Sequence, residues 1–437
     1  MILNERLFDI PEIYTKKLTE AITDSPDVVN LARGDSEFAT PNLVTEYLSR
    51  IILDDGDYES DINKPVGRWT HYEKESGSTR LINSIKKKYI NEAGLSLGSS
   101  NILVTQGGMN AIFYALYTIL NVGDEIIVCD PAYIAYESIC SYILKGIKVC
   151  RYKLFQSENY NFDYNRLAAI TNERTKALII SSPYNPCGRV YSYDELAELM
   201  EYCKLKEIFL VHDENHEKEV YDGFVHYPVS IFDKDFSNSI LLNSFSRLGM
   251  GGWRIGWMVA QKRIIDAAVR VHAFVNMTCN TFVQETAAYA LDNYAKLGFA
   301  DRFFGYKKKR DKLVSFFNRI SGIECPVPEG TCYLFPSIIE FYIKNKEIML
   351  MFIKNSEWFV GLSDVRRNHE EMMISKWKSY VVYLYFLLFL KVGVLPGCCY
   401  GEHSDNNIRL SFSVRDEAID EAIIRMQKLC GRGGSVE

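Results

Sequence analysis

The chain has 437 residues, of which 47% are hydrophobic and 24% charged, and its formal net charge is −6. This composition is typical of a globular protein with a large domain and a smaller one, and the acidic balance argues against nucleic acid as a partner. The eleven cysteines lack zinc-like spacing and do not suit a small disulfide scaffold, so we expect reduced thiols, no metal site and a cytoplasmic protein.

Between about residues 100 and 260, short apolar runs alternate with helical patterns. The runs are rich in Val, Ile and Leu without clean alternation, which is typical of strands covered on both faces of a mostly parallel sheet. Helices are predicted to begin near Gly108 and at Ser192, where Ser192 and Glu195 form a capping box. This alternation predicts a layered α/β domain. The strand candidates are 101–105, 125–129, 148–152, 177–181, 208–212, 240–243 and 257–260.

The C-terminal third has a different pattern, in which helical segments surround strand candidates at 333–336 and 408–413. We expect a large α/β domain over residues 45–295 and a small α+β domain formed by residues 1–44 and 296–437.

Within that third, the segment at about 361–385 is atypical, because a charged run leads into residues dense in Tyr, Val, Leu and Phe. It is interpreted as an insertion, an interaction element or the product of a faulty gene model. The most apolar stretch, 380–390, is roughly half as long as a membrane-spanning helix, so we expect no membrane partner.

Four motifs at predicted strand ends carry candidate chemistry. Residues 104–111 place two glycines before a helix, whose free N–H groups and dipole form an anion site. The loop 181–188 presents Asn185 where open α/β sheets bind ligands. Asp213 ends another strand, where its carboxylate suits a cationic ring nitrogen. The run 243–257 holds two serines and two arginines that suit a phosphate, although each motif alone is also compatible with an ordinary turn or loop.

In this order and spacing, the motifs resemble the class I and II aminotransferases, which are fold type I pyridoxal-phosphate (PLP) proteins. The resemblance implies a seven-stranded, mostly parallel sheet between helices, PLP as the cofactor and a homodimer. It also implies the transfer of an amino group between an amino acid and a 2-oxo acid. The resemblance runs from about residue 31 to the C-terminus and includes 31–35 with 40–41, 70–72 with Gly77, 328–333 and 407–411.

The resemblance implies which residues bind the cofactor. Asp213 would pair with the pyridine nitrogen of PLP, Asn185 would bond its phenolic oxygen, and Tyr133 would stack on its ring. His216 stands where many members have a tyrosine that bonds the same ring oxygen. The phosphate would lie on Gly108, Met109, Ser244 and Arg254.

The resemblance also implies how the substrate is bound. Arg409 would bind the α-carboxylate of the substrate through its guanidinium, with Asn185 beside it. Gly34, in the family's entry strand, would line the substrate site, and Tyr72 would reach into the neighbouring site of a homodimer.

At the anchor, the sequence departs from the family pattern. The family reads Ser-x-Ser-Lys, with an arginine eight positions after its Schiff-base lysine, whereas here Arg247 replaces the lysine and Arg254 follows one position early. Arginine stays protonated and its guanidinium is a poor nucleophile, so Arg247 cannot do the chemistry of the lysine.

Four interpretations of this departure remain open. The chain is an aminotransferase relative with weak or absent transamination, or an enzyme that uses PLP without a covalent lysine. In the second case His216 is a possible base, since histidine titrates near neutrality. Otherwise the chain is a non-catalytic pseudoenzyme that binds PLP, a substrate or a partner, or its sequence is altered by mutation or by a gene-model error.

Overall fold

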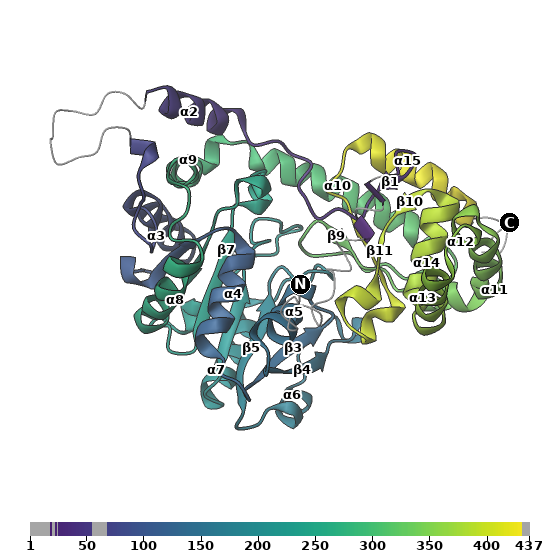
Figure 1. Ribbon diagram of the computed structural model, residues 1–437, viewed down its shortest axis with the longest axis horizontal. Coiled ribbons are helices and arrows are strands. Elements are labelled where there is room, and N and C mark those ends of the chain that lie inside the picture. The colour runs from purple at the N-terminus through teal and green to yellow at the C-terminus, as the bar shows by residue number, and fades with distance from the viewer. Residues whose placement is uncertain (1–17, 20–21, 24, 55–67, 431–437) are drawn as a thin grey trace, which may run out of the picture.

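The computed structural model describes residues 18–19, 22–23, 25–54 and 68–430, so much of the expected N-terminal part of the small domain lies outside the described residues. Figure 1 shows a large lobe built around a sheet and a smaller lobe formed mainly by the C-terminal third of the chain. The boundaries 1–44, 45–295 and 296–437 stay a prediction.

A seven-stranded sheet lies at the centre of the large lobe, as the apolar runs predict. The sheet order is β2-β8-β7-β6-β5-β3-β4. Every neighbouring pair is parallel except the two pairs that β8 forms, with β2 and β7, so the prediction of a mostly parallel sheet is confirmed. The strands are β2 (Ile102–Thr105), β3 (Glu125–Asp130), β4 (Lys148–Lys153), β5 (Thr175–Ser181), β6 (Phe209–Asp213), β7 (Ser239–Ser244) and β8 (Gly256–Val259).

Helices cover both faces of this sheet, which explains why the strands lack polar alternation. Along β5, Ala177 and Ile179 pack into one apolar cluster, while Leu178 and Ile180 pack into the other. The first cluster includes α4 (Gly108–Ile119), α5 (Ile134–Ser138) and α8 (Lys262–Val275). The second includes α3 (Thr79–Ala93), α6 (Tyr164–Ile170), α7 (Tyr193–Leu205) and α9 (Thr281–Asp292), and α2 (Asn42–Leu53) packs on α9.

The predicted capping box is present at the start of α7. The Ser192 hydroxyl accepts a hydrogen bond from the Glu195 N–H at 3.3 Å, and the Glu195 carboxylate accepts one from the Ser192 N–H at 2.8 Å. These two bonds satisfy donors that a helix start leaves free.

The small lobe joins distant parts of the chain. β9 (Tyr333–Leu334), β11 (Leu395–Pro396) and β12 (Ile408–Ser411) form an antiparallel sheet in the order β11-β12-β9. β1 (Val29–Asn30) pairs in parallel with β10 (Val392–Gly393), so the N-terminal segment does join this lobe. The strands predicted at 333–336 and 408–413 exist but are shorter. The helices of the small lobe include α10 (Phe299–Phe317), α11 (Ile339–Asn355) and α15 (Asp416–Met426).

The atypical segment folds as helices. After α12 (Glu357–Val360), α13 (Asp364–Lys376) is largely exposed, whereas every residue of α14 after Lys378 is buried as far as its end at Tyr385. The Asp405 carboxylate accepts bonds from the N–H groups of Lys378 and Ser379 at 3.0 and 2.9 Å, where the helix dipole favours an anion. α14 (Lys378–Tyr385) is therefore part of the core. In the part of the chain that the structure describes, no helix has the length and apolarity to span a bilayer.

Candidate active site

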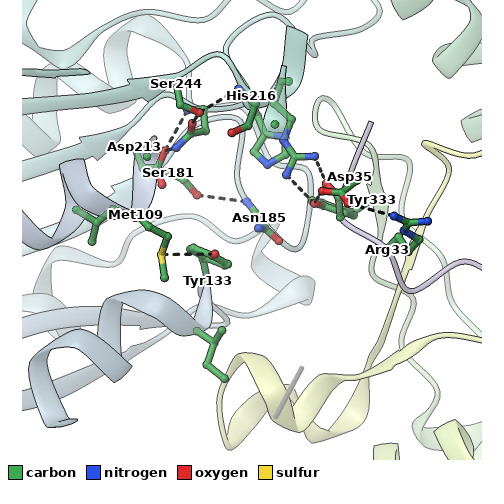
Figure 2. Close-up of a pocket in the computed structure, with 18 of the residues that line it drawn as sticks. Arg33, Asp35, Met109, Tyr133, Ser181, Asn185, Asp213, His216, Ser244 and Tyr333 are labelled. Atoms are coloured by element: carbon green, nitrogen blue, oxygen red, sulfur yellow. Dashed lines mark hydrogen bonds and ion pairs between the residues drawn. The ribbon is translucent and has the colours of Figure 1, made fainter. Parts of the chain in front are cut away.

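A cavity of about 470 Å³ lies where the carboxyl ends of three neighbouring strands face the small lobe (Figure 2). Ser181, Asp213 and Ser244 are the last residues of β5, β6 and β7, and all three line it. Every residue that the sequence singles out lines this cavity except Tyr72, whose side chain is 78% exposed elsewhere. The sheet topology thus brings together residues that are up to 375 positions apart in sequence, namely Gly34, Gly108, Met109, Tyr133, Asn185, Asp213, His216, Ser244, Arg247, Arg254 and Arg409.

One end of the cavity suits an anion. α4 begins at Gly108, and Gly107 just before it has a φ of +84°, which glycine adopts readily. A Cβ on Gly107 would lie 2.7 Å from Arg254 Nη2, so the absent side chain lets the guanidinium sit against the helix start. The Ser244 hydroxyl lies nearby and donates to Asn215 Oδ1 at 2.5 Å. A helix start, a hydroxyl and a guanidinium together form a phosphate-binding arrangement.

Asp213 is a buried carboxylate in the cavity wall, with both oxygens engaged. Tyr136 Oη donates to its Oδ2 at 2.7 Å, and the backbone and side-chain N–H groups of Asn215 donate to its Oδ1 at 3.0 and 2.6 Å. Burial and the charge of Asp213 raise the pKa of Tyr136 well above its ordinary value, so the phenol remains a donor. The carboxylate is therefore fixed in position.

Tyr133 and Met109 contact each other at the opposite side of the cavity from Tyr333 in Figure 2. The Tyr133 hydroxyl lies 3.8 Å from the Met109 sulfur, and its ring packs edge-on against Tyr136 with the centroids 5.6 Å apart. An aromatic ring is thus held in the cavity wall near Asp213.

The Arg247 side chain reaches across the cavity to the small lobe. Its Nη1 donates to the Gly34 carbonyl and its Nη2 to the Tyr333 hydroxyl, the second at 2.9 Å. Burial opposes its charge, yet Tyr333, Cys332 and Glu219 hold its pKa well above the ordinary value, so the guanidinium stays protonated. Among residues 25–54 and 68–430, no lysine lines this cavity.

Arg409 occupies the other side of Tyr333. Its guanidinium carbon lies 4.1 Å from the Tyr333 ring centroid and 5.1 Å from that of Tyr400. Nη2 donates to the Ala32 carbonyl at 3.1 Å and Nη1 lies 3.4 Å from Asn185 Oδ1, while Nε is buried with no partner in the described structure. A buried cation with an unpaired N–H suits a carboxylate ligand.

His216 lies beside Tyr333, with the ring centroids 5.5 Å apart. Its Nδ1 is 2.5 Å from Glu219 Oε2, and both side chains are almost fully buried. Burial and the charge of Arg247 lower the pKa of His216 below its ordinary value, while Glu219 acts in the opposite direction. The imidazole is therefore neutral at neutral pH.

Sequence reasoning missed five residues of this site. Glu219 follows His216 by three positions, and a turn rather than a helix brings the two side chains together, so the only signal in the sequence was the closeness of an acid to a histidine. Asn215 stands between two predicted site residues, so its place in the motif was also a signal. Tyr333 ends the 328–333 motif, which was a signal as well, whereas nothing in the sequence distinguishes Tyr136 and Tyr400 from the remaining tyrosines.

A family model for aminotransferase class I and II matches residues 26–426. The chain belongs to the class I and II aminotransferases. Members of this family use PLP. The chain is 27% identical to an aspartate aminotransferase of Pyrococcus abyssi, with 98% of each chain covered, and 26% identical to an aromatic-amino-acid aminotransferase of Thermococcus litoralis, also with 98% of each covered. Its fold matches a Rhizobium meliloti aspartate aminotransferase with a TM-score of 0.82 at 23% identity, over 99% of each chain.

The residues present in this class I/II chain fit the non-covalent contacts of PLP. The start of α4 with Arg254 and Ser244 suits the phosphate, and the fixed Asp213 carboxylate suits a protonated pyridine nitrogen. They do not fit covalent attachment, because no lysine of the described ranges lines the cavity and the guanidinium of Arg247, which does line it, stays charged.

Proposed function

We propose that this chain binds PLP in the cavity and transfers an amino group between an amino acid and a 2-oxo acid, at a rate strongly reduced by Arg247. The main observation behind this proposal is that three features line one cavity. They are the Asp213 carboxylate, the Arg409 guanidinium and the phosphate cup, by which we mean the start of α4 with Ser244 and Arg254. PLP, when bound, supplies an electron sink that weakens the bonds at the α-carbon of an amino acid.

The proposed roles follow from the donors and acceptors at each position. Asp213 holds the pyridine nitrogen protonated, and Tyr136 and Asn215 keep the carboxylate in place. Asn185 bonds the ring oxygen, and Tyr133 packs on the ring. The phosphate lies on Gly108, Met109, Ser244 and Arg254.

Arg409 provides the substrate contact. Its guanidinium lines the cavity and is positioned by the Ala32 carbonyl and the Tyr333 ring, which supports a charge-assisted bond to the α-carboxylate. Gly34 has no side chain, and a Cβ there would lie 3.0 Å from the Tyr333 hydroxyl, so glycine keeps this part of the cavity open.

The reduced rate follows from the chemistry of Arg247. A lysine at this position forms a covalent bond with PLP and carries protons, and both tasks need a neutral amine. Arg247 instead bonds the Gly34 carbonyl and the Tyr333 hydroxyl. Those bonds favour a second candidate, which is a non-catalytic protein that binds PLP and carboxylates. In that case Arg247 has a structural role, because its guanidinium holds Gly34 and Tyr333 in place.

We further propose a cytoplasmic homodimer. The exposed Tyr72 supports it, because a tyrosine that is 78% exposed and outside the cavity is available to a second subunit.

Visible absorbance spectroscopy tests the proposal. PLP added to the purified protein should give a spectrum distinct from that of free PLP, and it should change again on addition of aspartate or an aromatic amino acid. Asp213→Asn should weaken PLP binding by a factor on the order of 100, since a charged partner contributes about 3 kcal/mol. Asp233→Asn is the matched control, because Asp233 is also buried but lies outside the cavity.

Two results would decide against parts of the proposal. PLP that stays free in solution would remove the cofactor and the transfer reaction together. PLP binding without any response to amino acids or 2-oxo acids would favour the non-catalytic candidate.

A further inference from the structure

We propose that His216, held by Glu219, is the proton carrier of this site and takes over a task that Arg247 cannot perform. The proton removed from the α-carbon of a bound amino acid would pass to His216 Nε2. This inference rests on the proposed function and deepens it, because it assigns a base to a cavity without a lysine.

The geometry fixes which ring nitrogen is basic. His216 Nδ1 lies 2.5 Å from Glu219 Oε2, and a carboxylate can only accept, so Nδ1 carries the hydrogen of the neutral ring. Nε2 therefore keeps its lone pair. No residue in the described ranges bonds to Nε2, and the ring lines the cavity, so this nitrogen is available to a ligand.

The surroundings keep the ring neutral and in place. Tyr333 packs edge-on against it, and its other charged or titratable neighbours are Arg247, Asp213, Glu219 and Cys332. Burial and Arg247 lower the pKa of His216, so the ring is a base at neutral pH. Glu219 then offsets the positive charge that the ring gains when it takes a proton.

The other titratable groups of the cavity do not suit this task. The arginines stay protonated. Burial raises the pKa of the lining tyrosines, that of Tyr333 to about 12. Asp213 is engaged by Tyr136 and Asn215, and Asp35 pairs with Arg33 at an exposed position. Among the described residues that line the cavity, His216 is the one neutral base.

A metal ion is a poor alternative for this cluster. Candidate ligand atoms of His216, Glu219 and Cys332 lie within 4.8 Å of one another. However, Arg247 Nη1 lies 3.8 Å from the Cys332 sulfur, so the positive charge of the guanidinium would repel a metal cation bound by this cluster. Burial also raises the pKa of the Cys332 thiol to about 12, which disfavours the thiolate that a metal needs.

The proton transfer balances. The Cα–H bond of the substrate would break and an N–H bond would form at His216 Nε2, while PLP, when bound, would supply the electron sink for the pair left on the substrate. Return of the same proton from Nε2 to the product would leave His216 neutral again. No oxidant or reductant is needed.

Nitrogen NMR of the protein labelled with ¹⁵N-histidine tests the geometry without any reaction. Assigned with the help of His216→Gln, the His216 ring should show a protonated Nδ1 and an unprotonated Nε2 at neutral pH. Glu219→Gln should redistribute the hydrogen between the two nitrogens. A wild-type ring with its hydrogen on Nε2 would overturn the inference and leave the proposed function intact.

Exchange of the α-hydrogen of an amino acid in D₂O, with PLP present, tests the role. The wild-type rate should exceed that of free PLP, His216→Gln should lower it by a factor on the order of 100, and Glu219→Gln by roughly tenfold. His226→Gln is the matched control, because His226 forms a similar 3.1 Å pair with Glu214 outside the cavity. PLP affinity, measured on each variant, distinguishes loss of the base from loss of cofactor binding, because exchange is compared at saturating PLP.

Different outcomes of these experiments distinguish the role proposed for His216 from the proposed PLP-dependent function. If the wild type binds PLP but His216→Gln exchanges as fast as the wild type, the inference is wrong and the proposed function stands. Absence of PLP binding overturns both. His216→Tyr guards against misfolding of His216→Gln: it places the family's residue there, and it should bind PLP yet exchange as slowly as His216→Gln.

Discussion

Arg247 and Arg409 contact the same aromatic ring, with guanidinium carbons 5.7 and 4.1 Å from the centroid of Tyr333. One arginine belongs to the large sheet's loops and the other to the small lobe. Tyr333 therefore links Arg247 to Arg409, and a change at one is expected to affect the other.

Tyr333→Phe should weaken this link. The ring and its contacts with both guanidiniums remain, but Arg247 Nη2 loses its hydroxyl acceptor. A buried charged donor without a partner should cost about 1–3 kcal/mol of unfolding free energy. Urea denaturation measures the loss, and the same titration on Tyr342→Phe, half-buried and outside the cavity, is the control. Equal stability of Tyr333→Phe and wild type would mean that the hydroxyl contributes nothing.

Arg247→Lys should not restore full transaminase activity. The resemblance implies that the loop to Arg254 is one residue short of the family pattern. A lysine would also lose the two bonds that Arg247 donates, to the Gly34 carbonyl and to the Tyr333 hydroxyl. We expect a gain over wild type that stays at least tenfold below a variant that also carries one inserted residue before Arg254. Steady-state rates with aspartate and an aromatic amino acid compare the two, and a fully active single variant contradicts the expectation.

Gly107→Ala should disrupt the phosphate cup. Its φ of +84° strains any side chain, and the added Cβ would meet Arg254 Nη2 at 2.7 Å. Gly123→Ala is the control, because Gly123 has a φ of +94° but open space around its Cβ. Both should lose stability by about 1 kcal/mol or somewhat more, and only Gly107→Ala should weaken PLP binding, by roughly tenfold or more. Equal PLP affinity in the two variants would place the phosphate elsewhere.

Stability should fall below about pH 6.5 because three histidines are buried with lowered pKa values. His212, His216 and His272 bind protons more weakly folded than unfolded, so their contribution is present above pH 6.5 and is lost as the pH falls. Each contributes a slope of up to about 1.4 kcal/mol per pH unit below that value.

Denaturation at pH 7.5 and pH 5.5 measures this slope. His216→Gln should reduce the loss between the two values, whereas His71→Gln, at an exposed position, should leave it unchanged. A pH slope that is the same in His216→Gln and wild type would show that this ring is not buried in its neutral form.

The fold was predictable because the seven strands are short apolar runs whose two faces are both covered. Asp213 and Ser244 were predictable because each ends such a run, and strand ends meet at one edge of a parallel sheet. The partners of Asp213 were not, because Tyr136 reaches it from a helix that only the three-dimensional fold brings near. The atypical segment was also predictable only in part. Its apolar half packs as α14, as its composition suggests, but the sequence does not reveal that Asp405, 27 positions after Lys378, accepts a hydrogen bond at the start of this helix.

The short pairing of β1 with β10 constrains the order in which parts of the protein can fold while it is being synthesised. The N-terminal strand has its partner at Val392–Gly393, and the carbonyls of Ala32 and Gly34 have theirs on Arg409 and Arg247. A chain emerging from the ribosome can form the strands of the large sheet from its first 260 residues, but β1 has no strand partner until residues 392–393 have emerged, and the Ala32 carbonyl has none until Arg409 has emerged. The cavity is therefore among the last features to form, and a nascent chain cannot hold a substrate before synthesis is nearly complete.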